Sequence, residues 1–338
     1  MELRPSQIVA HLDRHVVGQD HAKRQVAVAV YTHFRKLAVA ARSGLEIVKS
    51  NVLLVGPTGT GKTLICETLA QALGVPFVTG NATSLAQGEY VNAEIEAILL
   101  RLIERAGGEV TRAAQGIVFI DEVDKLGRRE SGSSPGRGGE HVQHALLKIM
   151  EGAPVLLRDG RQIDTSRILF ICGGAFVGID EILSETHAFG YVSTGEDENQ
   201  KLLERLNARI KPTDLFRFGL IPEFTGRLPI VARLDALDRS TLVRIMTEPE
   251  NAIYRQFQAI LRETGVELHV APRVFAQIAD LAMEYKAGAR SLRGIFEEML
   301  MPVIYLVPDH PEVRRVQIDS LFENPRFLGS ANGALSDR

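Results

Sequence analysis

Apolar residues in the first two-thirds of the chain occur in two patterns. Four short continuous runs predict buried strands; they cover residues 51–55, 76–78, 116–120 and 167–172. Other segments carry apolar residues three and four positions apart, which predicts amphipathic helices; they cover residues 19–37, 62–73, 92–106 and 140–150. Strands that alternate with helices up to about residue 230 predict a parallel sheet flanked by helices, an α/β fold.

The pattern changes near Leu234. Helices are predicted at 239–263, 273–285 and 290–303, followed by a short strand near 313–318. We therefore expect a large α/β domain over residues 1–232 and a smaller, mostly helical domain over residues 233–322. The Gly/Ser/Asn-rich tail, residues 323–338, is predicted to be disordered.

Two stretches of the large domain lack either pattern. Residues 127–139, GRRESGSSPGRGG, are rich in glycine and serine and predict a mobile loop. Residues 184–200 are polar without a regular spacing and are expected to be irregular.

The bulk composition limits the class of protein. The 338 residues carry a net charge of −3, so no global basic field argues for nucleic acid. Two cysteines are too few for a zinc cluster or a disulfide framework. Without a signal pattern or an apolar run of the ~18 residues that a membrane span needs, the sequence predicts a soluble, cytoplasmic protein.

A glycine-rich segment follows the first predicted strand and opens a helix. Residues 56–63, GPTGTGKT, fit the pattern G-x-x-x-x-G-K-[ST] at every fixed position. In that pattern backbone N–H groups surround a β-phosphate, and the helix N-terminus adds partial positive charge. Lys62 is expected to reach the β- and γ-phosphates, and Thr63 to supply a hydroxyl to Mg²⁺. The predicted phosphate site comprises Gly56, Pro57, Thr58, Gly59, Thr60, Gly61, Lys62, Thr63 and Leu64.

A second acidic element lies further along the chain. The buried run 116–120 ends in Asp121-Glu122, and the carboxyl ends of parallel strands are where ligands bind in open α/β sheets. Asp121 is expected to hold the Mg²⁺ shell, and Glu122 to polarise the attacking water. The two elements predict an ATPase that uses ATP and Mg²⁺, while the lack of an N-K-x-D motif argues against a GTPase.

Five segments occur in the order seen in one known family. They are GPTGTGKT, FIDEVDK, DTSRILFICGGAF, FGLIPEFTGRLP and AGARSLR, preceded by VVGQDHAKRQVAVAVYTHFRKL. With these motifs the chain resembles the ClpX family of AAA+ protein unfoldases from about Pro5 to about Leu321. The resemblance implies a P-loop NTPase fold with a small C-terminal domain and a homohexameric ring.

The resemblance also implies roles for residues outside the phosphate loop. Val16 and Val17 would flank the adenine, and Arg290 would act as the sensor-2 arginine on the same nucleotide. Arg227 matches the arginine finger that reaches the γ-phosphate of the neighbouring subunit. Guanidinium groups suit both roles because they neutralise charge that develops on the transferring phosphoryl group.

Two further segments match family regions that contact other proteins. Tyr90 and Val91 lie where the family has a pore loop that grips the substrate polypeptide. Phe189-Gly190-Tyr191 is the nearest candidate for the loop that docks on a ClpP-like peptidase. Arg128, Arg129 and Arg137 fall where the family has its second pore loop, and they would either touch substrate or solvate the loop.

The chain departs from the family pattern at four places. The N-terminal Cys₄ zinc module of the family is absent, and Glu89 and Asn92 stand where the family has glycine around its pore loop. The segment 152–164 lacks a recognisable basic loop. The docking tripeptide of the family is Ile-Gly-Phe, which 189–191 does not reproduce.

These observations favour an ATP-dependent unfoldase that threads polypeptides through a hexameric pore. Two versions stay open: one feeds a ClpP-like peptidase, and the other remodels protein complexes without proteolysis. A nucleic-acid-directed AAA+ motor is a third alternative, which the near-neutral charge and the specific motifs disfavour.

Overall fold

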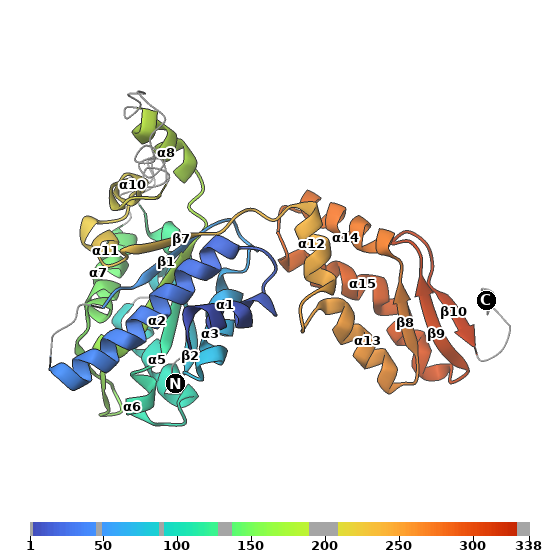
Figure 1. Cartoon of the computed structure of the whole chain (residues 1–338), viewed down its shortest axis with the longest axis horizontal. Coiled ribbons are helices and arrows are strands. Elements are labelled where there is room, and N and C mark those ends of the chain that lie inside the picture. Colours follow the sequence, from blue (N-terminus) through green and yellow to red (C-terminus); the bar gives the residue numbers. More distant parts are fainter. Residues whose placement is uncertain (1–2, 45–48, 88–90, 128–136, 189–208, 330–338) are drawn as a thin grey trace. The chain divides into compact units, whose positions relative to one another are not determined.

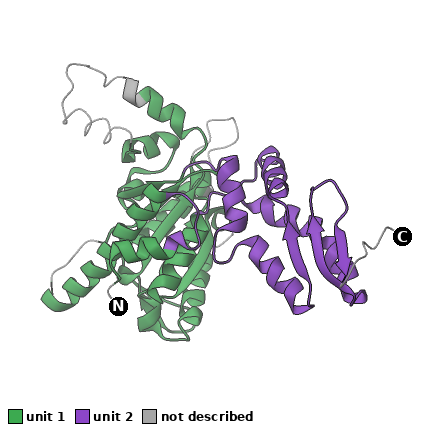
Figure 2. Cartoon of the chain, turned by 45° about the vertical axis from the view of Figure 1, so that its right-hand side comes forward, with its two compact units in different colours: residues 1–11, 20–57, 62–234 green, residues 12–19, 58–61, 235–338 purple. Residues whose placement is uncertain are grey.

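The structure is a computed structural model that describes residues 3–44, 49–87, 91–127, 137–188 and 209–329. Figure 2 shows the division of the chain into two units. Unit 1 comprises residues 1–11, 20–57 and 62–234, and unit 2 comprises residues 12–19, 58–61 and 235–338. The main boundary between the two units therefore lies between Leu234 and Asp235. Two short segments nearer the N-terminus, residues 12–19 and 58–61, also belong to unit 2.

A five-stranded parallel sheet forms the centre of unit 1. Its strands are β1 (Val52–Val55), β2 (Phe77–Asn81), β3 (Ile117–Asp121), β6 (Leu169–Gly174) and β7 (Ile230–Arg233). They lie in the order β2-β3-β6-β1-β7 (Figure 1). Strands β1 and β6 and the first four residues of β3 are buried because helices pack on both faces. The predicted α/β fold class is confirmed.

Helices and short 3₁₀ turns connect these strands. The helices of unit 1 and the junction are α1 (Pro5–Asp13), α2 (Asp20–Ser43), α3 (Lys62–Leu73), α4 (Ala82–Gln87), α5 (Val91–Arg105), α6 (Val110–Ala113), α7 (Arg137–Glu151), α8 (Ile179–Ala188), α10 (Pro212–Phe218) and α11 (Pro222–Gly226). The 3₁₀ turns are η1 (Val123–Leu126) and η2 (Thr165–Arg167). A small antiparallel hairpin, β4 (Pro154–Leu156) with β5 (Gln162–Asp164), follows α7.

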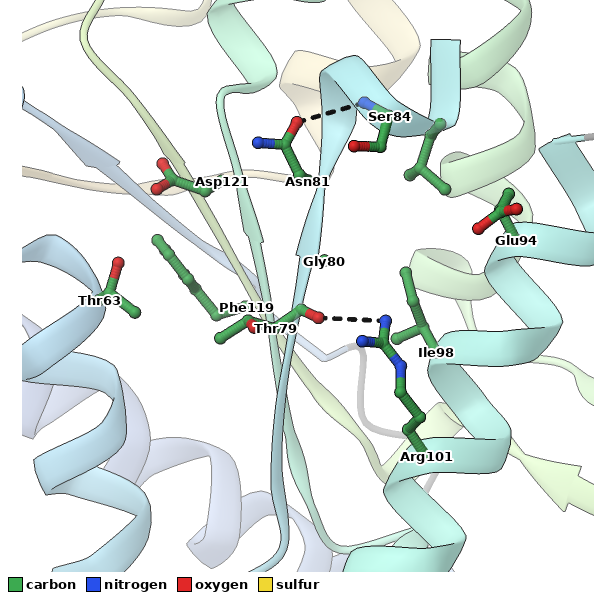
Figure 3. Close-up of a pocket in the computed structure, with 11 residues that line it drawn as sticks. Thr63, Thr79, Gly80, Asn81, Ser84, Glu94, Ile98, Arg101, Phe119 and Asp121 are labelled. Carbon is green, nitrogen blue, oxygen red and sulfur yellow. Dashed lines mark hydrogen bonds between the residues drawn. The ribbon is translucent and has the colours of Figure 1, made fainter. Parts of the chain in front are cut away.

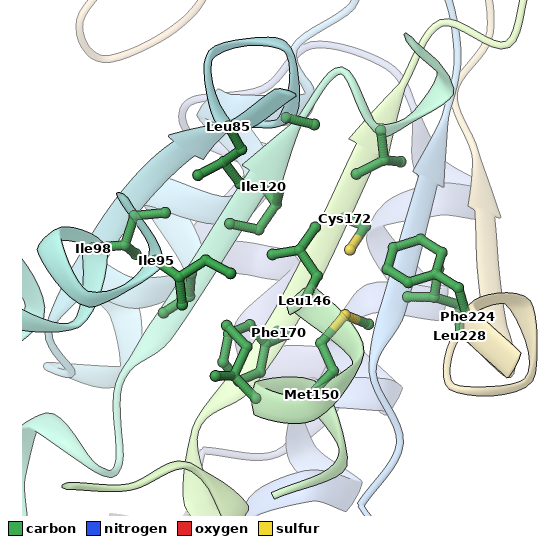
Figure 4. Close-up of a cluster of buried hydrophobic side chains, with 14 of the residues drawn as sticks. Leu85, Ile95, Ile98, Ile120, Leu146, Met150, Phe170, Cys172, Phe224 and Leu228 are labelled. Carbon is green, nitrogen blue, oxygen red and sulfur yellow. The ribbon is translucent and has the colours of Figure 1, made fainter. Parts of the chain in front are cut away.

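The core of unit 1 ties helix α7 to the sheet and to helix α11. Figure 4 shows Leu146 and Met150 of α7 between Phe170 of β6 and the pair Phe224 and Leu228. All five side chains are at most 1% exposed. A tightly packed interior fixes its members to within a fraction of an ångström, so the segment around residues 224–228 is held against the end of α7.

Unit 2 has its own core beneath a three-stranded sheet. Its elements are α12 (Arg239–Thr247), α13 (Ile253–Glu263), β8 (Glu267–Val270), α14 (Pro272–Glu284), α15 (Arg290–Leu306), η3 (Val307–Asp309), β9 (Val313–Ile318) and β10 (Arg326–Gly329). Strand β9 pairs in parallel with β8 and antiparallel with β10. Phe296 centres the core, with its ring centroid 5.5 Å from that of Phe257 and 6.3 Å from that of Phe275.

Three sequence-based predictions need correction. Residues 184–188 were expected to be irregular but lie in α8, and the helix predicted over 239–263 is two helices. The break falls before Pro249, because proline has no backbone N–H to continue the helical hydrogen bonds. The tail was predicted to be disordered from residue 323, yet Arg326–Gly329 forms β10. Several shorter elements are not predicted by the sequence patterns: the helices α1, α4, α6, α10 and α11 and the strands β4, β5, β7 and β8.

A buried histidine and a half-buried lysine lie beside β6. His33 of α2 is 3% exposed and its Nε2 lies 3.1 Å from the Arg167 carbonyl oxygen. Burial lowers the pKa of His33 to about 4, against the opposing effect of that carbonyl. Lys49 donates to the carbonyls of Ile149 (3.3 Å), Thr165 (2.8 Å) and Ile168 (3.4 Å), and burial lowers its pKa to about 7.

The buried His33 makes a prediction for acid stability. Its pKa is about 4 in the folded protein against 6.5 for the ordinary side chain, so below pH 6.5 protonation favours the unfolded chain. Between pH 7 and pH 5 this costs about 2 kcal/mol of unfolding free energy. His33→Gln, which keeps an N–H donor, should remove that part of the pH dependence in urea titrations at the two pH values.

The exposed His144 provides the matched control for this experiment. Its side chain is 53% exposed, so His144→Gln should leave the pH dependence unchanged. An equal loss of pH dependence in both variants would show that burial of His33 is not its cause.

Candidate functional site

The phosphate-binding loop joins the end of β1 to the start of α3. Gly56 cannot carry a side chain, because a Cβ there would lie 2.7 Å from the Leu234 carbonyl oxygen. Gly61 has φ of 100°, a left-handed conformation that L-residues rarely adopt. Helix α3 begins at the next residue, Lys62, so its unpaired N–H groups and positive dipole end belong to this loop.

Lys62 is folded back over the loop that precedes it. Its side chain is only 7% exposed, and Nζ donates to the carbonyls of Gly56 (2.5 Å) and Pro57 (3.0 Å). These bonds place a buried ammonium group against the loop backbone. The arrangement suits a phosphate because an ammonium with three donors can bond an anion while it keeps loop carbonyls as partners.

The acidic pair Asp121-Glu122 lies at the carboxyl end of β3. In the sheet, β6 separates β3 from β1 and its phosphate-binding loop. Asp121 is the last residue of that strand, and its Oδ1 accepts the backbone N–H of Glu122 at 2.9 Å. Glu122 has φ of 62°, a left-handed conformation that costs a non-glycine residue about 1–2 kcal/mol. The strained turn directs the chain into η1 and sets the direction of the Glu122 side chain.

Two residues that the sequence analysis did not single out hold the Glu122 carboxylate. Glu122 Oε2 accepts a bond from Asn81 Nδ2 (3.0 Å) and one from Thr83 Oγ1 (2.9 Å). Asn81 ends β2 and pairs in register with Asp121 on the neighbouring strand. The Asn81 Oδ1 in turn accepts the N–H groups of Thr83 and Ser84. The signal in the sequence is Asn81-Ala82-Thr83, which begins three residues after the strand predicted at 76–78.

A cavity of about 470 Å³ opens beside β2 and β3 (Figure 3). Thr63 and Asp121 both line it, together with Asn81, Glu94 and Arg101. Figure 3 shows Thr63 and Asp121 on the same side of β2, while Arg101 reaches across to the Thr79 carbonyl at 3.3 Å. The structure thus brings the two predicted Mg²⁺ ligands to one cavity.

The donor set of this cavity fits Mg²⁺ that arrives with a nucleotide. A hydroxyl and a carboxylate are the hard oxygen ligands that Mg²⁺ prefers. Within the described residues no group of three or more His, Cys, Asp or Glu side chains could hold a metal ion. A small number of protein ligands is typical of Mg²⁺ sites in which phosphate oxygens and water complete the coordination shell.

Arg227 lies at the end of α11, away from the buried core. Its guanidinium Nη2 donates to Glu151 Oε1 at 2.8 Å, and the arginine side chain is 41% exposed. Phe224, three residues earlier, and Leu228, the next residue, are both buried. Arg227 is therefore a surface cation on a rigid segment, which is the setting that a finger toward another chain requires.

The other predicted site residues have different settings. Val16 and Val17 are 4% and 8% exposed in unit 2, and Arg290 is the exposed first residue of α15. Val91 begins α5, but its side chain is 7% exposed and packs in the core of unit 1, so it presents little surface to a substrate. The predictions for Tyr90, for Phe189, Gly190 and Tyr191, and for Arg128 and Arg129 fall outside the described residues.

Known proteins and families match almost the whole chain. A family model described as an AAA domain of the Cdc48 subfamily matches residues 48–231, and one described as the C-terminal D2-small domain of ClpB matches residues 237–316. The ATP-dependent Clp protease ATP-binding subunit ClpX 3 of Methylococcus capsulatus is 42% identical over 94% of this chain and 79% of its own length. The chain belongs to the ClpX family of AAA+ proteins.

Other members of the ClpX family give the same picture. ClpX of Treponema denticola is 43% identical over 90% of this chain and 77% of its own length. ClpX of Azotobacter vinelandii is 42% identical over 93% and 77%, respectively. The predicted resemblance is confirmed, and so is the prediction of an ATPase. Among the helices that the structure describes, none is both long and apolar enough to span a bilayer.

The bonds to Glu122 predict a role for Asn81 in turnover. Asn81→Ala removes one of two donors on Oε2, and a hydrogen bond to a charged group is worth about 1.5–3 kcal/mol. We expect ATP turnover to fall by about tenfold with little change in KM, since the carboxylate loses its fixed orientation. Steady-state ATPase assays at saturating Mg-ATP measure both quantities.

Ser84→Ala is the control, because the Ser84 backbone N–H that bonds Asn81 stays in place. Its kcat should match that of the unmodified protein. A kcat for Asn81→Ala equal to that of Ser84→Ala would show that the bond to Glu122 is not needed.

Proposed function

We propose that this protein is an ATP-dependent unfoldase that works as a homohexameric ring and threads polypeptides through its central pore. The observation that carries the proposal is that one protomer both holds a carboxylate in a fixed orientation and presents an arginine at its surface. Glu122 is held by Asn81 and Thr83 beside the phosphate loop, whereas Arg227 is 41% exposed at the end of α11. An exposed finger suits a nucleotide that lies in a neighbouring protomer.

The residues of one protomer divide the work of hydrolysis. The loop from Gly56 to Gly61 and Lys62 would bind and orient the phosphates of ATP. Thr63 and Asp121 would hold Mg²⁺, which would supply positive charge to neutralise the phosphates when bound. Glu122 would orient the attacking water and accept its proton, because a carboxylate with a fixed rotamer has its remaining lone pairs aimed in one direction.

The guanidinium groups would act on charge that develops at the transferred phosphoryl group. Arg227 of the neighbouring protomer and Arg290 of the same chain are the two candidates, with Val16 and Val17 against the adenine. An arginine supplied in trans is worth 10³–10⁵-fold in turnover in related phosphoryl-transfer enzymes. Hydrolysis would therefore depend on contact between protomers.

The mechanical output rests on the pore residue. Tyr90 would grip an extended polypeptide by its aromatic ring, which has large contact area and needs no specific sequence in the substrate. Since Val91 is buried, the proposal assigns the grip to Tyr90 alone. Rounds of ATP hydrolysis around the ring would move this side chain along the pore.

The names of the relatives support a peptidase as partner. Each is an ATP-binding subunit of an ATP-dependent Clp protease. We propose that this chain docks on a ClpP-like peptidase through Phe189, Gly190 and Tyr191. Since this tripeptide differs from the Ile-Gly-Phe of the family, remodelling without proteolysis is the second candidate function.

Glu122→Gln tests the hydrolytic assignment. The amide keeps the size of the side chain but cannot accept a proton, so turnover should fall by at least about 10²-fold while ATP binding is retained. A fluorescent ATP analogue measures binding, and phosphate release measures turnover. Turnover within twofold of the unmodified protein would remove Glu122 from the mechanism.

A degradation assay separates the two candidate functions. The protein is mixed with a ClpP-type peptidase, ATP and an unstructured tagged substrate. If the protein feeds a peptidase, the substrate should be lost in an ATP-dependent manner. Phe189→Ala should then abolish this loss without lowering ATP turnover. ATP turnover with no loss of substrate would instead favour remodelling.

A further inference from the structure

Three consecutive residues in the last turn of helix α7 each accept a hydrogen bond from another part of unit 1. The Ile149 carbonyl accepts from Lys49 at 3.3 Å, and the Met150 carbonyl accepts from Asn51 Nδ2 at 3.3 Å. The Glu151 carboxylate then accepts from Arg227 Nη2 at 2.8 Å. The first two bonds satisfy carbonyls that a helix leaves unpaired at its C-terminal end. All three join α7 to the residues before β1 and after α11.

Asn51 connects this helix end directly to the backbone of Arg227. Its Nδ2 donates to the Arg227 carbonyl at 3.0 Å as well as to Met150, so both amide protons are used. Asn51 is 1% exposed, and its Oδ1 has no hydrogen-bond partner within the described part of the chain. Burial of an amide oxygen without a hydrogen bond costs free energy of folding. Asn51 therefore contributes to the structure through its two donated bonds.

Glu151 holds the other end of the same arginine. Its side chain is 43% exposed, similar to the 41% of Arg227. An ion pair between exposed side chains contributes little to folding stability, because solvent screens it and ordering two long side chains opposes it. What the contact does fix is the direction of the guanidinium, since a planar group held by one Nη presents its remaining N–H donors in a defined direction.

We propose that Asn51 and Glu151 are positioning residues for Arg227. Asn51 fixes the backbone of the arginine against α7, and Glu151 orients its guanidinium toward the nucleotide of the neighbouring protomer. The packing of Met150 with Phe224 and Leu228 completes a rigid base for the finger (Figure 4). This inference rests on the proposed role of Arg227 in trans.

Mixed rings test the inference, because they separate the chain that offers a finger from the chain that receives it. Arg227→Ala chains receive but cannot offer, and Glu122→Gln chains offer but cannot hydrolyse. Each variant alone should have low ATPase activity, and mixing the two before assembly should restore activity at interfaces between unlike chains. This baseline tests the proposed function.

Glu151→Ala is then placed on one chain type at a time. On the Glu122→Gln chain, which offers the finger, it should lower the restored kcat by about 10- to 100-fold, the effect of a misplaced catalytic group. On the Arg227→Ala chain it should change the restored activity by less than twofold. Glu151→Gln, which keeps an acceptor oxygen, should recover most of the loss, and Asn51→Ala should follow the same chain dependence.

Asp180→Ala on the finger-offering chain is the matched control. Asp180 pairs with Arg233 at 2.7 Å on the same unit and is also exposed, so its loss should leave the restored activity unchanged. The positioning role is overturned if the mixture regains activity and Glu151→Ala does not lower it, or lowers it equally from either chain. The proposed role of Arg227 as a finger would then still stand. Failure of the baseline mixture to regain activity overturns both the finger and the positioning role.

Discussion

The register of parallel strands is the constraint on which the hydrolytic site depends. Strands β1, β2 and β3 all end at the same edge of one sheet, and Asn81 lies opposite Asp121 in the β2–β3 pair. The β2–β3 pairing places the Asn81 amide within 3.0 Å of Glu122, and the loop after β1 brings Thr63 to the same cavity as Asp121. A shift of one residue in β2 would turn Asn81 to the other face of the sheet and leave Glu122 without that donor.

The same edge explains why much of the site was predictable from the sequence. The phosphate loop is a local motif, and Lys62 and Thr63 follow from it because loop and helix are contiguous. The pair Asp121-Glu122 follows from a buried run that ends in two acids. Asn81 and Thr83 were missed, because their contact with Glu122 exists only once β2 and β3 pair, some 40 residues apart in sequence.

Elements with weak local patterns were harder to predict. Strand β10 has four residues and depends on its pairing with β9, which composition alone does not reveal. Arg227 could be named from its motif, but its contacts with Asn51 and Glu151 join segments 176 and 76 residues away in the chain. Long-range hydrogen bonds of this kind are set by packing in the core and have no signature in a single sequence.

Under the proposed mechanism, hydrolysis needs two protomers, one that binds ATP and one that offers Arg227. The most direct test is the ATPase activity per protomer as a function of protein concentration at saturating Mg-ATP, with the state of assembly followed by analytical ultracentrifugation. We expect specific activity to rise with concentration in step with the hexamer fraction. A dilute monomer with the full specific activity of the concentrated protein would contradict this mechanism.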